Sequence, residues 1–482
     1  MPVGYIGYGN TVFFIFCEKY YVKGVEFVSG QKKIGLIACT GLVIANMMGS
    51  GIALLPSQLA SFGGISIISW GITLIGAVAL AYVFSELGAE DEILGGPPAY
   101  AKEVSRAFGF QSSIIYYVAN WVGNIAIGIT GVAYLSHYFP VLENPIVSTL
   151  VLAGIIWLLT GLNLLGGKWV SKVATFGVVL MLIPIIITTF GGWFFFDVEV
   201  YKSNWISHAS TATSNSQAIL AGVLLCLWAF IGVESASVSG NNVENPKKTI
   251  PKATMIGVAF AGIIYVASSQ VMLGMFPASD LAASSAPFAM TMSLMIGDWA
   301  AGFPVIATTF TCFTCLSAWM LLVSESAETS AEQGDLPKLF LADKKTGVPR
   351  KGLILTSIFM TVVLLAFGLT KGEGSGTSEL FNEMVGIAVL MTMIPYIYSS
   401  MNLLRFGKQR GKGFIVLAAS VVATAFCMVA ILGGGSIPIA GTFIVSLIVL
   451  LFYARKEGIE QHEEMLQAEQ QGDSQADQPE QE

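Results

Sequence analysis

The stretch Asn46-Met47-Met48-Gly49-Ser50-Gly51 interrupts the first long apolar segment, which runs roughly from Ile34 to Pro56. Each glycine in a helix interior costs about 1 kcal/mol relative to alanine, so this stretch is poor helix material. A broken helix in hydrocarbon exposes backbone amide and carbonyl groups that lipid cannot satisfy, and these groups must line a cavity or meet a ligand. The sequence therefore predicts a broken membrane helix with a site beside it.

A second interruption, Phe230-Ile231-Gly232-Val233-Glu234-Ser235, lies in the sixth apolar segment. Paired interrupted helices in corresponding positions of two halves are the best sequence indication of a transporter's binding site. Small residues also let membrane helices pack closely, so close packing is the alternative explanation for the glycines. The carboxylate of Glu234 within the second interruption favours the binding site.

The composition is that of a polytopic membrane protein. Of the 482 residues, 54% are hydrophobic and only 11% are charged, whereas soluble domains carry about 25% charged residues. The six cysteines and three scattered histidines show no metal site, nucleophile triad or phosphate loop. We therefore expect no cofactor, no metal and no nucleic-acid partner, and these absences disfavour a membrane-embedded enzyme.

Twelve apolar segments have a length suitable for membrane-spanning helices, which predicts an all-α protein with one transporter domain over residues 31–456. The first ten form two sets of five, within about 31–196 and 217–403, and each set begins with a broken helix. We expect these sets to be an inverted repeat, with the last two spans, within 414–454, as additions. The expected spans are 34–55, 65–87, 112–139, 146–166, 173–196, 217–240, 253–276, 301–328, 352–369, 384–403, 414–433 and 437–454, with a short external helix over 281–298.

Basic residues gather in alternate loops, whereas the remaining loops between spans hold only Lys202 and Lys371. Because cytoplasmic loops carry the excess of lysine and arginine, both termini are expected in the cytoplasm. The tail over 457–482 is rich in acidic residues and glutamine, which predicts a disordered segment. Residues 1–30 form a leader whose apolar run is too short to span a membrane.

Backbone groups at the two interruptions can hold an amino acid without any charged side chain. At Gly49-Ser50-Gly51 a second half-helix begins, and its free N–H groups and positive dipole end favour a carboxylate. Carbonyls at Ile231-Gly232 can face an ammonium. Glu234 is ionisable at membrane depth, which indicates function, although a structural cap of the broken helix is the alternative.

Aromatic and amide side chains near these breaks complete the expected site. Trp228 and Trp319 are mid-span and can attract an ammonium through their ring faces. Asn120 and Asn124 are four residues apart on one helical face, close to Tyr116 and Tyr117. Ordinary interhelical hydrogen bonding is the alternative role for these polar groups.

Five stretches resemble the basic amino acid/polyamine antiporters of the APC superfamily, and in particular their cadaverine/lysine branch. The resemblance implies a LeuT-like fold of five plus five inverted helices. It covers about residues 28 to 460. The stretches begin at Asn46, Leu227, Tyr116, Gly386 and Ala440.

The resemblance also implies roles for individual residues. The expected substrate-binding residues are Asn46, Gly49, Ser50, Gly51, Tyr116, Tyr117, Ala119, Asn120, Asn124, Trp228, Ile231, Gly232, Glu234 and Trp319, and those expected to affect transport are Tyr100, Tyr265 and Tyr453. An aspartate that the branch carries in the turn after span eight is replaced, since the turn here is Glu332-Gln333-Gly334. Roles in the cytoplasmic vestibule are therefore not carried over.

By this resemblance the protein is an antiporter of the bacterial inner membrane that imports lysine and exports cadaverine, coupled to a cytoplasmic lysine decarboxylase in acid resistance. An arginine/agmatine or ornithine/putrescine exchanger, a general permease, a channel and an amino-acid sensor remain alternatives, and a homodimer is left open. The stretch that begins at Val28 resembles a family N-terminus, so residues 1–27 are expected to be a mis-assigned extension.

Overall fold

The computed structural model describes most of the chain between residues 33 and 476. The described ranges are 33–48, 51–89, 96–165, 170–207, 214–238, 240, 243–343, 348–370, 376–407 and 413–476. Within them the regular structure is helical, apart from one isolated bridge between Ile34 and Val243. The expected leader, as well as Gly49 and Ser50, lies outside the described residues.

Helices occupy all the segments that the sequence predicts to cross the membrane. Ten helices in the described ranges are long and apolar enough to do so, or eleven when the bent pair α2 and α3 counts as one span. The ten lie on α4 (Ser66–Gly88), α6 (Arg106–Leu135), α7 (Pro145–Leu164), α8 (Val170–Gly191), α12 (Pro246–Met275), α15 (Gly302–Glu332), α16 (Arg350–Gly368), α17 (Gly376–Gly407), α18 (Gly413–Leu432) and α19 (Ser436–Ala476).

Both interruptions expected from the sequence fall between separate helices. The first segment consists of α2 (Leu36–Met47) and α3 (Gly51–Ala60), whose axes differ by 45°. The sixth consists of α10 (Asn215–Trp228) and the four-residue α11 (Ser235–Val238), joined by turns. Because α10 and α11 are short, neither qualifies as a span by itself, and for this reason fewer than twelve spans are counted.

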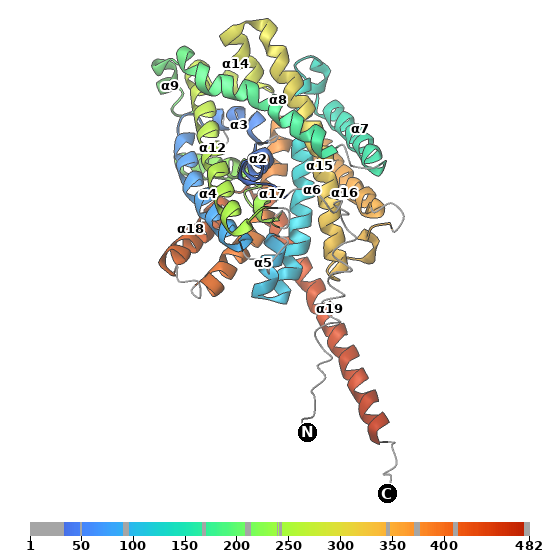
Figure 1. Ribbon diagram of the computed structural model, residues 1–482. Coiled ribbons are helices and arrows are strands. Elements are labelled where there is room, and N and C mark those ends of the chain that lie inside the picture. Colours follow the sequence, from blue (N-terminus) through green and yellow to red (C-terminus); the bar gives the residue numbers. More distant parts are fainter. Residues whose placement is uncertain are drawn as a thin grey trace.

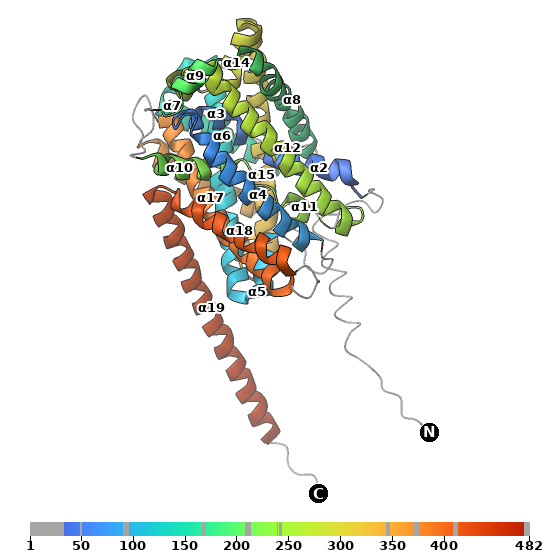
Figure 2. The same ribbon diagram turned by 90° about the vertical axis from the view of Figure 1, so that its left-hand side faces the viewer.

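Short helices mark the two ends of the bundle. The α5 helix lies at one end, and α9 and α14 lie at the other, as both views show (Figures 1 and 2). The short external helix expected over 281–298 is observed as two helices, α13 and α14. The bounds of the shorter elements are α5 (Pro97–Val104), α9 (Val198–Ser203), α13 (Ala278–Ala283), α14 (Pro287–Ile296), η1 (Pro140–Glu143), η2 (Gly192–Phe195), η4 (Asp298–Ala301) and η5 (Lys338–Phe340).

The helices differ strongly in burial, which separates a protein core from a lipid-facing shell. In the most apolar windows of α6 and α17, 83% and 78% of the residues are buried, against 11% for α19. Large apolar side chains such as Leu158, Phe176 and Leu451 point outward. Lipid is as apolar as leucine, so this exposure is expected of a membrane protein. The central helices α6 and α17 are therefore the natural place for a site.

The α19 helix continues past the bundle to Ala476 and projects from its α5 end (Figures 1 and 2). This differs from the disorder expected from Glu457 onward. Residues 457–476 are rich in Glu and Gln, which both favour a helix. Because an apolar helix already precedes them, adding further turns carries no new nucleation cost.

Candidate functional site

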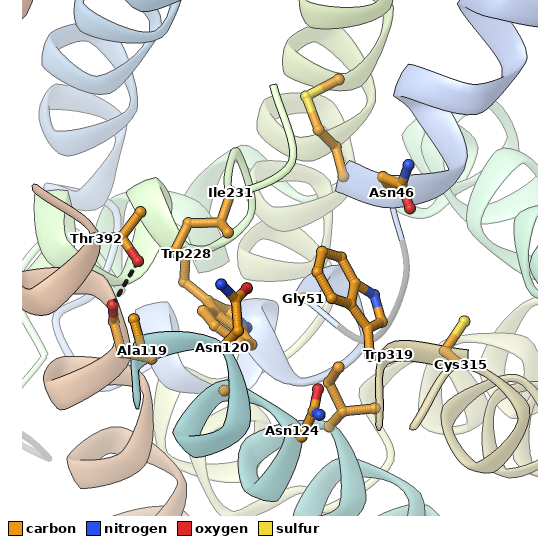
Figure 3. A pocket seen from close by; sticks show the side chains of 14 residues that line it. Asn46, Gly51, Ala119, Asn120, Asn124, Trp228, Ile231, Cys315, Trp319 and Thr392 are labelled. Atoms are coloured by element: carbon orange, nitrogen blue, oxygen red, sulfur yellow. Dashed lines mark hydrogen bonds between the residues drawn. The ribbon is translucent and has the colours of Figure 1, made fainter. Parts of the chain in front are cut away.

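A cavity lies where the two breaks meet α6, α15 and α17. Figure 3 shows its lining side chains, with Asn120 and Asn124 reaching in from α6 and Trp319 from α15. The lining residues are Asn46, Met47, Gly51, Ala119, Asn120, Gly123, Asn124, Ile127, Trp228, Ile231, Cys315, Trp319, Ala388 and Thr392. Of the residues expected to bind substrate, eight are brought together here.

The two breaks approach each other closely because both carry glycine. Gly232 has φ of 106°, in the region that favours glycine, and a Cβ there would lie 3.1 Å from the backbone C and O of Asn46. A Cβ on Gly51 would lie 3.4 Å from Ala229 Cα. Gly232 itself is not among the lining residues, but its close contact with Asn46 brings the two breaks together beside the cavity.

The cavity is polar but uncharged, since none of its described lining residues is ionised at neutral pH. Asn120 donates its Nδ2–H to the Tyr116 carbonyl (2.7 Å), which leaves its Oδ1 as an acceptor. Thr392 donates to the Ala388 carbonyl (2.7 Å). The buried Asn124 Nδ2 has no hydrogen-bond partner in the described part of the chain. Such groups can hold an ammonium and a carboxylate by hydrogen bonds.

Trp228 and Trp319 add aromatic surface to the cavity. Trp228 packs against α6, where a Cβ on Gly123 would lie 3.1 Å from the indole ring. Its Nε1–H is buried without a partner among the described residues. Trp319 is only partly buried and extends into the cavity (Figure 3). An ammonium against these ring faces gains roughly 0.5–2 kcal/mol.

Glu234 lies beside the cavity and does not line it. Its Oε1 accepts a hydrogen bond from the Tyr116 hydroxyl (2.8 Å), and its Oε2 accepts from the Tyr396 hydroxyl (2.6 Å) and from Gly232 N (3.1 Å). With 2% of its surface exposed, the carboxylate is buried among these donors. This arrangement matches the alternative role of a structural cap, because the acid joins the broken sixth segment to α6 and α17.

Other expected residues also lie outside the cavity. The Tyr117 hydroxyl shares a hydrogen bond with Thr356 (2.8 Å), and the Tyr265 hydroxyl donates to the Ala229 carbonyl at the second break (3.0 Å). Tyr100 is buried near the α5 end, and the Tyr453 hydroxyl donates to Glu457 (3.2 Å). Of these, Tyr265 bears most directly on the site, since it holds a carbonyl of the broken helix.

Several lining residues were not expected from the sequence, and the whole contribution of α17 was missed. Helical spacing carries the signal that could have found them. Gly123 and Ile127 extend the face of Ala119, Cys315 is four residues before Trp319, and Ala388 is four residues before Thr392. Small or apolar residues give no chemical indication of a site, so only this spacing could have revealed them.

Comparison with known proteins gives consistent matches. A family model described as amino acid permease matches residues 34–465. The chain is 50% identical over 430 residues to the cadaverine/lysine antiporter of Escherichia coli strain K12, which covers 89% of this chain and 96% of that protein. It is 33% identical over 370 residues to the putrescine transporter PotE of Haemophilus influenzae, with 77% and 83% coverage. PotE of Escherichia coli strain K12 is 31% identical over 371 residues, with 77% and 82% coverage.

Proposed function

The chain belongs to the amino acid permease family, and from this premise we propose that it is an antiporter that exchanges external lysine for internal cadaverine. The observation that carries the proposal is the 50% identity, over 89% of this chain, to an antiporter of these two compounds. The putrescine transporters, at 33% and 31% identity, are more distant. Integral insertion in the bacterial inner membrane follows from the same relatives and from the apolar helices.

The chemistry of the cavity supports a cationic amino acid and a diamine as substrates. An ammonium is a pure hydrogen-bond donor, and the Asn120 Oδ1, left free when its amide bonds Tyr116, is a matching acceptor. The carboxylate of lysine fits the start of α3 near Gly51, where helix N–H groups are unpaired. The α-ammonium fits the carbonyls near Ile231. Gly49 and Ser50 complete this proposed set.

The membrane arrangement is part of the proposal. We place twelve spans in a LeuT-like fold, with both termini in the cytoplasm and inverted repeats over about residues 31–196 and 217–403. The broken first and sixth segments then occupy corresponding positions in the two halves, as such a repeat requires. The α5 end of the bundle is the cytoplasmic end in this arrangement.

Exchange is physically reasonable although it opposes the membrane potential. Lysine carries a net charge of +1 and cadaverine +2, because amino groups of this type stay protonated below about pH 10. Each cycle therefore moves one positive charge outward. Against an inside-negative potential this costs roughly 2.3 kcal/mol per 100 mV, which corresponds to a concentration-gradient product of roughly 50-fold. Decarboxylation of lysine in the cytoplasm would sustain that gradient while consuming a proton, which links the exchange to acid resistance.

Proteoliposomes containing the purified protein test the proposal. Vesicles loaded with cadaverine, agmatine or putrescine are each offered labelled lysine, arginine or ornithine. We expect the lysine and cadaverine pair to exchange fastest and flux to cease when the lumen holds no counter-substrate. Faster exchange of ornithine with putrescine, or of arginine with agmatine, would reject the pair proposed here. Flux into empty vesicles would instead indicate a channel.

A further inference from the structure

Side chains from three other helices, α5, α6 and α19, contact the turn that follows α15 at the α5 end of the bundle. The turn contains Gly334 with φ of 79°, and Asp335 N donates back to the Ser330 carbonyl over 2.8 Å. From α5, the Lys102 ammonium donates to Gln333 Oε1 over 3.2 Å. This segment is therefore a tight, shaped corner to which other elements attach.

Lys456 of α19 makes the strongest of these attachments. Its Nζ donates to the Gly334 carbonyl over 2.6 Å and lies 4.0 Å from Asp335 Oδ1. The same ammonium lies 5.3 Å from the centre of the Phe110 ring on α6. Lys456 is the last lysine or arginine of the chain.

Asp335 ties the turn to α6 as well. Its side chain is only 9% exposed, and its Oδ2 accepts a hydrogen bond from Ser113 Oγ at 3.4 Å. A carboxylate so deeply placed needs compensating charge or hydrogen bonds, and Lys456 with Ser113 supplies both. Removing the lysine would leave the buried carboxylate without a compensating charge, and this cost favours the state in which Lys456 and Asp335 are in contact.

The contacts among Lys456, Asp335 and Ser113 lie between the two helices that flank the cavity, at the α5 end. The substrate cavity lies between α6, at Asn120 and Asn124, and α15, at Trp319. Near the α5 end, Ser113 of α6 is joined to Asp335 in the turn that follows α15. A solute that passes between the cavity and that end requires α6 and α15 to separate there. The contacts of Lys456 oppose that separation.

We propose that Lys456 and Asp335 form a latch that holds the α5 end of the transport pathway closed. The inference rests on the proposed function only in that a transporter must open at this end during its cycle. Release of the Lys456 ammonium from Gly334 and Asp335 frees the turn, and α15 then moves away from α6. The latch thereby sets how often the site is open toward the α5 end.

Cysteine labelling tests the latch without any transport measurement. Ser112 is fully buried one residue from Ser113, and its hydroxyl lacks a partner among the described residues, so Ser112→Cys places a reporter under the latch at little cost. The labelling rate with a membrane-impermeant maleimide is measured in inside-out vesicles for Lys456→Gln and for the matched control Arg455→Gln. Arg455 has the same charge but is exposed beside the latch. The parent without Ser112→Cys gives the background.

We expect labelling to be roughly fivefold faster in Lys456→Gln than in Arg455→Gln, because a hydrogen bond from a charged donor shifts such an equilibrium by about tenfold and partial exposure weakens it. Asp335→Asn is the second test and should also speed labelling, but less than Lys456→Gln, because the bond from Lys456 to the Gly334 carbonyl remains. Equal labelling of the lysine and arginine variants overturns the latch. So does labelling of the Asp335→Asn variant at the rate of the Arg455→Gln control. Exchange in proteoliposomes is measured separately, and its failure would reject the proposed function while leaving the labelling result intact.

Discussion

Tyr396 donates its hydroxyl hydrogen to Glu234 Oε2 over 2.6 Å, and the contact joins α17 to the break in the sixth segment. Tyr116 of α6 makes the matching contact to Oε1 at 2.8 Å. Asn120, one helical turn away on α6, lines the cavity and bonds the Tyr116 carbonyl. Tyr116, Tyr396 and Glu234 therefore form a hydrogen-bonded layer on the α5 side of the cavity, which we call the floor.

Tyr396→Phe is expected to make the transporter leak. The change removes one donor of the floor while the ring keeps its packing against Phe84, whose centroid lies 4.8 Å away. Flux of labelled lysine into vesicles without counter-substrate should rise several-fold above the wild-type background. Tyr117→Phe is the control, because the Tyr117 hydroxyl bonds Thr356 away from the cavity. A leak of equal size in both variants would show that the floor is not the barrier.

Glu234→Gln is expected to weaken lysine and cadaverine by the same factor. The carboxylate accepts three hydrogen bonds, and replacing charged by neutral acceptors should cost roughly 2–4 kcal/mol in all. The loss should appear as a lower melting temperature, because the carboxylate braces the broken helix. Calorimetric binding of both substrates decides the matter. A larger loss for cadaverine, which brings no carboxylate of its own, would instead make Glu234 a counter-ion for the substrate.

Asn124→Ala is expected to weaken both substrates about tenfold without lowering stability. Its buried amide nitrogen has no partner among the described residues, so removing it relieves an unsatisfied group. Its Oδ1 is the acceptor that an ammonium of either substrate needs, and a hydrogen bond to a charged ligand is worth roughly 1.5–3 kcal/mol. Apparent affinity and melting temperature are measured together on the same preparation. Unchanged affinity with a lower melting temperature would leave Asn124 a purely structural role.

Asn204→Ala is expected to destabilise the end of the bundle at which α9 and α14 lie. Its Nδ2 donates to the carbonyls of Leu273 and Phe276 at 2.7 and 2.8 Å, and its Oδ1 accepts from Ala278 N at 2.9 Å. Losing three buried hydrogen bonds should cost roughly 2–4 kcal/mol. Thermal unfolding in detergent checks this against the exposed Asn215→Ala, which should change stability by less than about 0.5 kcal/mol.

The exchange of lysine for cadaverine is expected to respond to membrane voltage. One positive charge leaves per cycle, so an imposed inside-positive potential should accelerate lysine uptake into cadaverine-loaded vesicles and an inside-negative potential should slow it. Valinomycin with potassium gradients sets the potential. Lysine-for-lysine exchange is the control, since it moves no net charge. Equal voltage responses in the two modes would contradict the proposed stoichiometry.

Sequence reasoning located the helices and the two breaks, because glycines within apolar segments and the length of those segments have direct consequences in a membrane. It also selected most of the polar and aromatic residues of the cavity, from Asn46 to Trp319. It left two roles open for Glu234, since an acid at membrane depth looks the same whether it meets a substrate or two tyrosine hydroxyls. Tyr396 and Thr392 come from a distant part of the chain, and no local pattern reveals that α17 closes the site.

The tail over residues 457–476 shows a second limit of prediction from sequence. Its composition is equally compatible with a solvated coil and with a helix, and the decision depends on the helix that precedes it. In the structure the apolar part of α19 is continuous with residues 457–476. The composition of the tail alone cannot predict this helix, because the helix forms only if the preceding span continues into it.

The close crossing at Gly232 and Asn46 restricts how substrate choice can change during evolution. A Cβ at Gly232 would lie 3.1 Å from the backbone of Asn46, so this position cannot vary without losing the crossing. The opposite wall is built from side chains on three long helices, among them Ala119, Asn120 and Thr392. Relatives with other diamines or amino acids are therefore expected to keep the glycine crossing and diverge on this wall, which is also where engineered specificity should begin.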